Sequence, residues 1–176
     1  MMLLVCGGAA SGKSAYAESM LCRLSGDAPR VYLATMKPFG DEAAARIARH
    51  RAQRAGAGFE TCECWSDLQD APIQPDSAVL LEDIGNLCAN ELFGPAGSGD
   101  GAAEKIVRGA AALRKKSRCL VVVTNELGSG GADYAGDTLR YLHVMGEVNR
   151  RLAAMADAVC EVACGLAEYY KGEEPA

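Results

Sequence analysis

The segment Gly7-Gly8-Ala9-Ala10-Ser11-Gly12-Lys13-Ser14 decides the fold. It satisfies the pattern G-x-x-x-x-G-K-[ST] at every fixed position. The apolar run Leu3 to Cys6 precedes it directly, and a helical pattern begins at Lys13. Small residues let the backbone curl until its N–H groups converge on phosphate oxygens, and the helix directs its positive end at the same point. The segment therefore predicts a loop that binds the phosphates of GTP or ATP.

Two side chains of this loop have specific roles in phosphate and metal binding, and a third group, a carboxylate, must come from another part of the chain. Lys13 can reach the β- and γ-phosphates, and the Ser14 hydroxyl can ligate Mg²⁺. A phosphate loop also needs an acidic partner for the magnesium at the end of another strand. The run Val79-Leu80-Leu81-Glu82-Asp83 supplies two carboxylates there. Spacing alone leaves open which of Glu82 and Asp83 takes which role.

Short apolar runs alternate with longer helical patterns along the chain. The expected strands are Leu3 to Cys6, Val31 to Ala34, Ala78 to Leu81, Cys119 to Thr124 and Ala158 to Val162. The expected helices are Lys13 to Leu24, Glu42 to Arg54, Gly85 to Phe93, Ala102 to Lys116 and Thr138 to Ala156. Continuous apolar strands suit a parallel sheet covered on both faces. We therefore expect a single α/β domain over residues 1–176, a RecA-like P-loop NTPase with a mostly parallel sheet flanked by helices.

Composition excludes several other classes of protein. Net charge is −5 and no dense Lys/Arg run occurs, which argues against a nucleic-acid partner. No apolar stretch reaches the roughly 20 residues of a membrane span. The start, Met1 to Cys6, is too short for a signal peptide and runs into glycine. We expect a cytoplasmic protein.

The eight cysteines do not follow the spacing of a metal site. Cys62 and Cys64 form the sole close pair, and neither a second pair nor a histidine couple completes a zinc pattern. Cys6, Cys88, Cys119 and Cys160 lie in or beside apolar runs, where cysteine behaves as a small hydrophobe. We therefore expect no structural metal.

The two histidines differ in their surroundings. His50 lies on the basic stretch Arg46 to Arg54, whereas His143 has no such setting and is interpreted as structural or surface. A basic stretch of this kind is usually a solvated helix face. Its arginines could also hold a triphosphate and disfavour protonation of His50, leaving a neutral nucleophile. Both interpretations of His50 remain open on this pattern alone.

An ordered set of blocks resembles a known family, the bifunctional adenosylcobinamide kinase/adenosylcobinamide-phosphate guanylyltransferases of cobalamin biosynthesis. The blocks cover most of the chain: Gly7 to Ser14, Tyr32-Leu33-Ala34-Thr35, Asp41 to Arg51 with its Asp-Glu, Arg-Ile and His positions, Leu80-Leu81-Glu82-Asp83, Val121-Val122-Val123-Thr124-Asn125-Glu126-Leu127-Gly128, and Val148 to Asp157. The resemblance implies that GTP guanylylates His50 and that the GMP then passes to the phosphate of adenosylcobinamide phosphate. It also implies phosphorylation of adenosylcobinamide, a small-molecule corrinoid, by ATP or GTP with Lys13 serving that step.

The resemblance further assigns nucleotide contacts and an assembly. The contacts are Gly7, Gly8, Ala9, Ala10, Ser11, Gly12, Lys13, Ser14, Ala34, Thr35, Met36, Arg51, Ala52, Gln53, Arg54, Glu63 and Glu82. We expect Mg²⁺ at Ser14 and Glu82, and a homo-oligomer, a trimer in this family.

The chain departs from the family pattern at four places, and the corrinoid contacts stay unassigned. Arg49 stands where relatives commonly have the first of two adjacent histidines, and His50 is the retained second one. Ser129 to Asp133 replaces an Ile-Val-Pro run, and Glu147 stands where an arginine is expected. The stretch Glu168 to Lys171 also departs, and we expect a chain end docked on the surface.

Asn125 and Glu126 follow a strand, at the position where open parallel sheets bind ligands, but Asn125 could equally cap a turn.

Two other functions are compatible with a phosphate loop. One is a small-molecule kinase without the guanylylation step, in which His50 merely lies near the phosphates. The other is a GTP-dependent switch protein, which the absence of an Asn-Lys-x-Asp segment disfavours.

Overall fold

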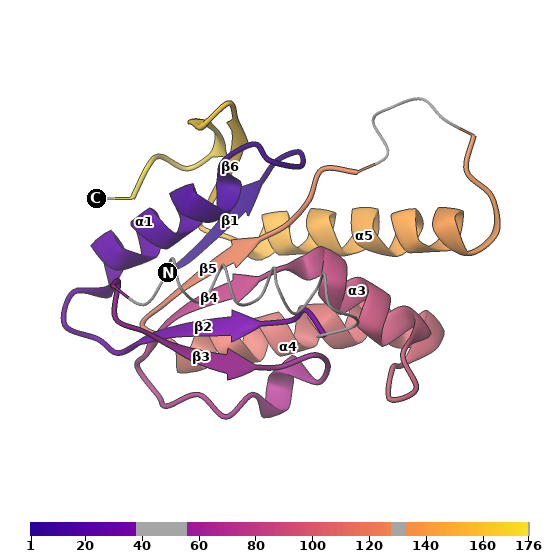
Figure 1. The fold of residues 1–176 in the computed structure, drawn as a ribbon, viewed down its shortest axis with the longest axis horizontal. Helices are drawn as coiled ribbons and strands as arrows, with labels where there is room; N and C mark the ends of the chain where they lie inside the picture. The colour runs from indigo at the N-terminus through magenta and orange to yellow at the C-terminus, as the bar shows by residue number, and fades with distance from the viewer. Residues whose placement is uncertain (38–55, 128–132, 176) are drawn as a thin grey trace.

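The structure is a computed structural model that describes residues 1–37, 56–127 and 133–175. A seven-stranded sheet in the order β3-β2-β4-β5-β1-β6-β7 forms its centre (Figure 1). The elements are β1 (Met2–Cys6), α1 (Lys13–Ser25), β2 (Arg30–Ala34), β3 (Phe59–Glu63), the 3₁₀ helix η1 (Leu68–Asp70), β4 (Ala78–Glu82), α3 (Ile84–Phe93), the 3₁₀ helix η2 (Gly99–Gly101), α4 (Ala102–Lys116), β5 (Cys119–Val123), α5 (Gly136–Met155), β6 (Ala158–Ala163) and β7 (Leu166–Lys171).

The sheet is parallel except at one edge. Strands β1 to β6 run parallel, and β7 pairs antiparallel with β6. β5 lies between β1, which leads into the phosphate loop, and β4, which ends in the acidic pair. The expectation of a mostly parallel, RecA-like sheet flanked by helices is confirmed, and so are the five predicted strands and four of the predicted helices. The fifth helix, expected over Glu42 to Arg54, lies outside the described residues.

Alternating side chains of the central strands fill two cores, one on each face. Leu4, Leu81 and Val122 belong to the core shared with α3, α4 and α5. Leu3 and Val121 belong to the core shared with α1. Successive side chains of a strand point to opposite faces, so a strand buried on both faces reads as one continuous apolar run. The two cores hold the carboxyl ends of β1, β2, β4 and β5 at one edge of the sheet.

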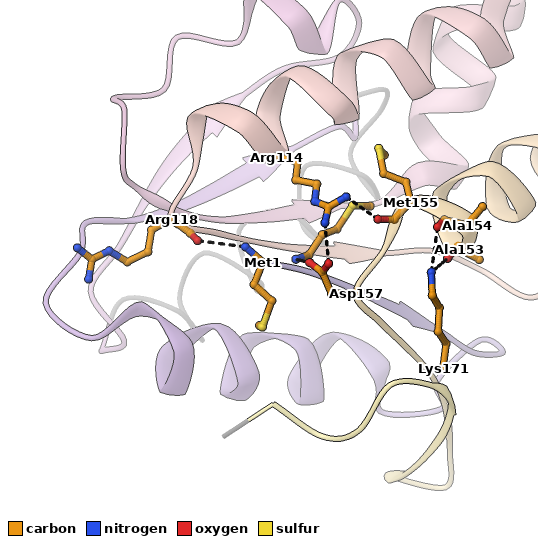
Figure 2. Close-up of polar contacts among 9 residues, drawn as sticks. Met1, Arg114, Arg118, Ala153, Ala154, Met155, Asp157 and Lys171 are labelled. Atoms are coloured by element: carbon orange, nitrogen blue, oxygen red, sulfur yellow. Dashed lines mark hydrogen bonds and ion pairs between the residues drawn. The ribbon is translucent and has the colours of Figure 1, made fainter.

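The chain end predicted to dock on the surface is instead an edge strand. Residues 166–171 form β7, and their burial alternates between half-buried and exposed along most of the strand. Glu168 and Tyr170 are among the exposed residues of this strand. Because polar residues occupy such positions, the stretch lacks the continuous apolar run that would have predicted a strand. The Lys171 ammonium donates to the carbonyls of Ala153 and Ala154, at 3.0 and 2.9 Å, and so closes the end of α5 (Figure 2). The expectation of a merely docked end was therefore wrong.

A second junction holds the end of α5 against the start of β1. Figure 2 shows the Arg114 guanidinium donating to the Met155 carbonyl and to Asp157, both at 2.6 Å. The second carboxylate oxygen of Asp157 accepts from the backbone N–H of Met2 at 2.6 Å. The Asp157 carboxylate thus links α4 to β1 just beyond the end of α5, and Arg114 holds the last residue of α5 through its carbonyl. In the described ranges, no helix is long and apolar enough to span a membrane.

Candidate nucleotide-binding site

The phosphate loop lies between β1 and α1, where two glycines permit its close turns. Gly12 precedes α1 with φ at 94°, in the left-handed region that favours glycine. A Cβ on Gly7 would lie 2.5 Å from the carbonyl oxygen of Val162, so this position accepts no side chain. The sequence pattern predicted the loop, and the structure shows why both glycines are needed.

The turn of the β6–β7 hairpin supports the loop from behind. The N–H of Gly165 donates to the carbonyl of Ser11 at 2.8 Å, and a Cβ on Gly12 would lie 3.1 Å from Gly165 Cα. One turn further along α1, the hydroxyls of Tyr16 and Tyr169 share a hydrogen bond of 2.7 Å. Sequence reasoning missed this support, although a two-residue turn with glycine is a hairpin signal. The edge strand therefore fixes the backbone that is to hold phosphate.

Lys13 is held over its own loop. Its side chain is mostly buried, and its ammonium donates to the carbonyl of Gly8 at 3.0 Å. An ammonium has three donors, so this bond leaves capacity for phosphate oxygens.

The structure distinguishes the roles of Glu82 and Asp83, which the sequence left open. Glu82 accepts a hydrogen bond from the Ser14 hydroxyl at 2.5 Å. Its second carboxylate oxygen is buried and has no hydrogen-bond partner among the described residues. Asp83 instead caps α3, with one oxygen accepting from the Asn86 N–H at 2.6 Å and the other from the Asn86 amide at 3.1 Å. Ser14 and Glu82 thus offer the hard oxygen donors that suit Mg²⁺.

The predicted contacts on β2 and β3 lie at the same edge of the sheet. Ala34 pairs with Glu63 on one side and with Glu82 on the other. The buried Thr35 hydroxyl donates to the carbonyl of Asp83 and accepts from its N–H, both at 2.7 Å. The Thr35 side chain is therefore occupied in fixing the turn between β4 and α3.

A cavity of about 690 Å³ opens in front of the phosphate loop. One part of its lining comes from the loop and α1, and the other part comes from α3, α5 and the ends of β4 and β5. The lining residues are Ala9, Ala10, Ser11, Gly12, Lys13, Ser14, Ala15, Glu18, Asp83, Gly85, Asn86, Ala89, Asn125 and Tyr141. The cavity therefore extends beyond the loop to polar groups on other elements.

Glu63 lies at a different cavity. It lines a hollow of about 380 Å³ together with residues 64–67 and 70–72. In the described part of the chain, Ala34, Thr35 and Met36 line neither of these two cavities. The contacts that the resemblance assigns are thus distributed over two regions of the sheet edge.

One group of predicted nucleotide contacts belongs to a stretch that the structure does not describe. His50, Arg51, Ala52, Gln53 and Arg54 lie outside the described residues. His143, interpreted from the sequence as structural or surface, is exposed on α5.

Several cavity residues were missed by sequence reasoning. Gly85, Asn86, Ala89 and Tyr141 sit on α3 and α5, far along the chain from the loop. Burial raises the pKa of Tyr141 to about 12, so its phenol stays protonated at neutral pH. The spacing of these four cavity residues along their helices did not mark them as a binding site. Similar residues recur at the same spacing on the packed face of any helix.

The end of β5 is fixed by a short network. The buried Thr124 hydroxyl donates to the Asn149 side chain at 2.6 Å, and the Asn149 amide donates to the carbonyl of Asn125 at 3.3 Å. The N–H of Glu126 donates to the carbonyl of Gly7 at 3.1 Å. The backbone around Asn125 is thus bound to the phosphate loop and to α5.

All eight cysteines lie in the described ranges, and all are free thiols. Within those ranges, no group of three or more His, Cys, Asp or Glu side chains could hold a metal ion. A magnesium ion on a phosphate loop needs fewer protein ligands, because substrate phosphates and water supply the rest.

The sheet order and the complete phosphate loop define a P-loop nucleotide-binding protein. A crystal structure of the flagellar accessory protein FlaH from Methanocaldococcus jannaschii shares this fold, with a TM-score of 0.50 at 11% identity over 98% of this chain and 78% of that one. At that identity the likeness shows the fold alone.

The family follows from sequence comparison. Residues 3–169 match the model of the family described as cobinamide kinase / cobinamide phosphate guanyltransferase. The bifunctional adenosylcobalamin biosynthesis protein CobU of Salmonella typhimurium is 39% identical over 94% of this chain and 97% of its own length. The protein of the same name from Escherichia coli is 36% identical over the same shares. The chain belongs to this family of kinases and nucleotidyltransferases.

Proposed function

We propose that this protein phosphorylates adenosylcobinamide with ATP or GTP and then transfers GMP from GTP to adenosylcobinamide phosphate. The observation that carries the proposal is the family match over residues 3–169 combined with a phosphate loop in which Lys13, Ser14 and Glu82 are in place. Family membership indicates the two reactions, and the loop provides the machinery that phosphoryl transfer needs.

In the kinase step, a hydroxyl oxygen of the corrinoid attacks the γ-phosphorus. A new P–O bond forms, the bond between the γ-phosphorus and the bridging oxygen breaks, and the nucleoside diphosphate leaves while the hydroxyl proton is released. Lys13 and the loop N–H groups hold the phosphates and offset the charge that develops on them. Ser14 and Glu82 would hold Mg²⁺, which supplies further neutralisation of that charge when bound.

In the guanylyl step, the neutral imidazole of His50 attacks the α-phosphorus of GTP, and pyrophosphate leaves. The phosphate oxygen of adenosylcobinamide phosphate then attacks the same phosphorus, the P–N bond breaks, and adenosylcobinamide-GDP forms. The resemblance around His50 supports this role. The position of Glu63 at a second cavity supports a nucleotide contact away from the phosphate loop. The family resemblance is the support for the contacts that we assign to Ala34 to Met36 and to Arg51 to Arg54.

Three further properties belong to the proposal. Residues 1–176 form one domain, because β1 pairs with β5 and β6 and so joins distant parts of the chain in one sheet. Free thiols throughout suit the reducing cytoplasm. Membership of the family favours a homo-oligomer, which we take to be a trimer.

The test of the guanylyl step is covalent labelling. The protein is incubated with GTP labelled at the α-phosphate and Mg²⁺, then denatured, and its bound label is counted. We expect label that is lost in acid, retained in alkali and absent from His50→Ala, with His143→Ala as the matched control that keeps it. A wild-type protein that binds GTP but takes no label would overturn the covalent intermediate and favour a kinase without guanylylation.

A further inference from the structure

Three polar side chains from three elements converge over Gly85, at the end of the cavity beyond the phosphate loop. A Cβ on Gly85 would lie 2.9 Å from the amide nitrogen of Asn125, 3.1 Å from the Tyr141 hydroxyl and 3.2 Å from a carboxylate oxygen of Asp83. These groups come from the ends of β5 and β4 and from α5. Their convergence therefore depends on glycine at position 85, and together they form a polar recess, here called the Gly85 recess.

The hydrogen-bonding capacity of the recess is only partly used. Among the described residues, no group bonds the side-chain amide of Asn125. The Tyr141 hydroxyl donates to the carbonyl of Gly85 at 3.2 Å and keeps its lone pairs. Asp83 accepts two bonds from Asn86, and a carboxylate has about four acceptor sites. The recess thus retains a donor, the Asn125 amide, and an acceptor, the Asp83 carboxylate.

A hydroxyl group matches this pair, because it accepts through its lone pairs and donates through its proton. The recess shares one cavity with Lys13 and Ser14, so a ligand seated there lies beside the phosphates held by the loop. A second phosphate is a poor match for the recess, because the Asp83 carboxylate would repel it.

We propose that the Gly85 recess binds the hydroxyl of the alcohol that accepts the γ-phosphoryl group, and so forms the corrinoid side of the kinase site. Asn125 donates to the hydroxyl oxygen, and Asp83 accepts a hydrogen bond from the hydroxyl, so that the oxygen is oriented toward the γ-phosphorus. The new P–O bond forms as the bond between the γ-phosphorus and the bridging oxygen breaks, the diphosphate leaves, and the hydroxyl proton is released to solvent. This inference rests on the proposed kinase activity and assigns residues to it.

The cleanest perturbation is Asn125→Ala, because the amide makes no bond whose loss would weaken the described fold. The assay measures phosphorylation of adenosylcobinamide by γ-labelled ATP over a range of corrinoid concentrations, with ATP affinity measured separately by equilibrium binding. One hydrogen bond is equivalent to about a tenfold effect. We expect kcat/KM for the corrinoid to fall about tenfold while the Kd for ATP stays within twofold. Gln69→Ala, an exposed amide on η1, is the matched control and leaves both values unchanged.

A second variant tests the geometry of the recess. Gly85→Ala places a methyl group among the three polar atoms, so we expect a larger loss of kcat/KM for the corrinoid than in Asn125→Ala. The matched control is Gly146→Ala on α5, where a Cβ meets nothing within 4 Å. If Gly85→Ala does not fold, Asn125→Ala decides the matter alone.

The outcomes separate this inference from the activity on which it rests. A wild-type protein that phosphorylates no adenosylcobinamide overturns the proposed kinase function itself. A wild-type protein that is active, with Asn125→Ala within twofold of it, overturns the assignment of the recess and leaves the kinase function standing. An equal loss of ATP affinity and of corrinoid kcat/KM in Asn125→Ala also overturns it, because the amide would then act through the nucleotide.

Discussion

Glu82→Gln is expected to stabilise the nucleotide-free protein while weakening its magnesium-dependent nucleotide binding. The carboxylate keeps one oxygen bonded to the Ser14 hydroxyl, and its other oxygen is buried without a partner among the described residues. Glutamine preserves the shape and the acceptor for Ser14 but removes the charge. The free protein therefore loses a buried charge, and the bound protein loses a group suited to the cation.

The magnitude follows from the desolvation of one polar oxygen. A buried polar group without a partner costs about 1–3 kcal/mol, and more if it is charged. The amide is also incompletely paired, so we take the low end and expect a gain of about 1 kcal/mol in the free energy of unfolding. For a chain of this length, that raises Tm by about 2–4 °C. Loss of a group that only orients a metal ligand weakens metal affinity by about 10- to 100-fold, so removal of the proposed ligand Glu82 is expected to weaken it at least that much.

Two measurements check this prediction. Thermal unfolding without nucleotide or magnesium gives the change in Tm, and nucleotide binding with Mg²⁺ or with EDTA gives the magnesium-dependent part. Glu104→Gln is the matched control, since its exposed carboxylate pairs with Arg151 at 2.8 Å away from the cavity. A Glu82→Gln protein that unfolds at a lower temperature and binds magnesium and nucleotide normally would refute the role of Glu82.

Three other perturbations test the loop, the fold and the thiols. Gly12→Ala forces a side chain into φ 94° and against Gly165, so nucleotide affinity should fall at least about tenfold, whereas Gly146→Ala should leave it unchanged; equal affinities would contradict the support from the hairpin. Asp157→Ala leaves the Met2 N–H without its acceptor, so the free energy of unfolding in urea should fall by about 1–3 kcal/mol with nucleotide affinity intact. Burial raises the pKa of the Cys88 thiol from 9.0 to about 12, so above pH 9 the unfolded chain releases a proton that the folded chain keeps. The contribution of Cys88 to the free energy of unfolding is therefore complete below pH 9 and is lost as the pH rises toward 12. Between pH 8 and pH 10, the free energy of unfolding measured in urea should fall less in Cys88→Ala than in the wild type.

The fold could be predicted where its signals are local and continuous. The phosphate loop is a contiguous pattern, and the central strands, buried on both faces, read as apolar runs. The edge strands β3 and β7 were not predicted from the sequence. Both are partly exposed to solvent, so their sequences mix polar and apolar residues and contain no continuous apolar run. Edge strands carry this weak pattern in general, since one side of each has no neighbouring strand.

The site could be predicted only as far as chain neighbours define it. Glu82 and Asp83 are adjacent at one strand end, so spacing could not reveal that one faces Ser14 and the other caps α3. The recess over Gly85 joins residues from β4, β5 and α5, and only the crossing of these elements in space brings them together. The departures from the family pattern gave no indication of it, because Asn125 and Asp83 lie inside the matching blocks.

The most direct test of the account supplies adenosylcobinamide, γ-labelled ATP, α-labelled GTP and Mg²⁺ to the purified protein and follows both labels into the corrinoid. We predict that the γ-label appears first in adenosylcobinamide phosphate and that the α-label appears afterwards in adenosylcobinamide-GDP, with Lys13→Ala abolishing the first product. Transfer of neither label to the corrinoid, by a folded protein that binds nucleotide, would contradict the central claim.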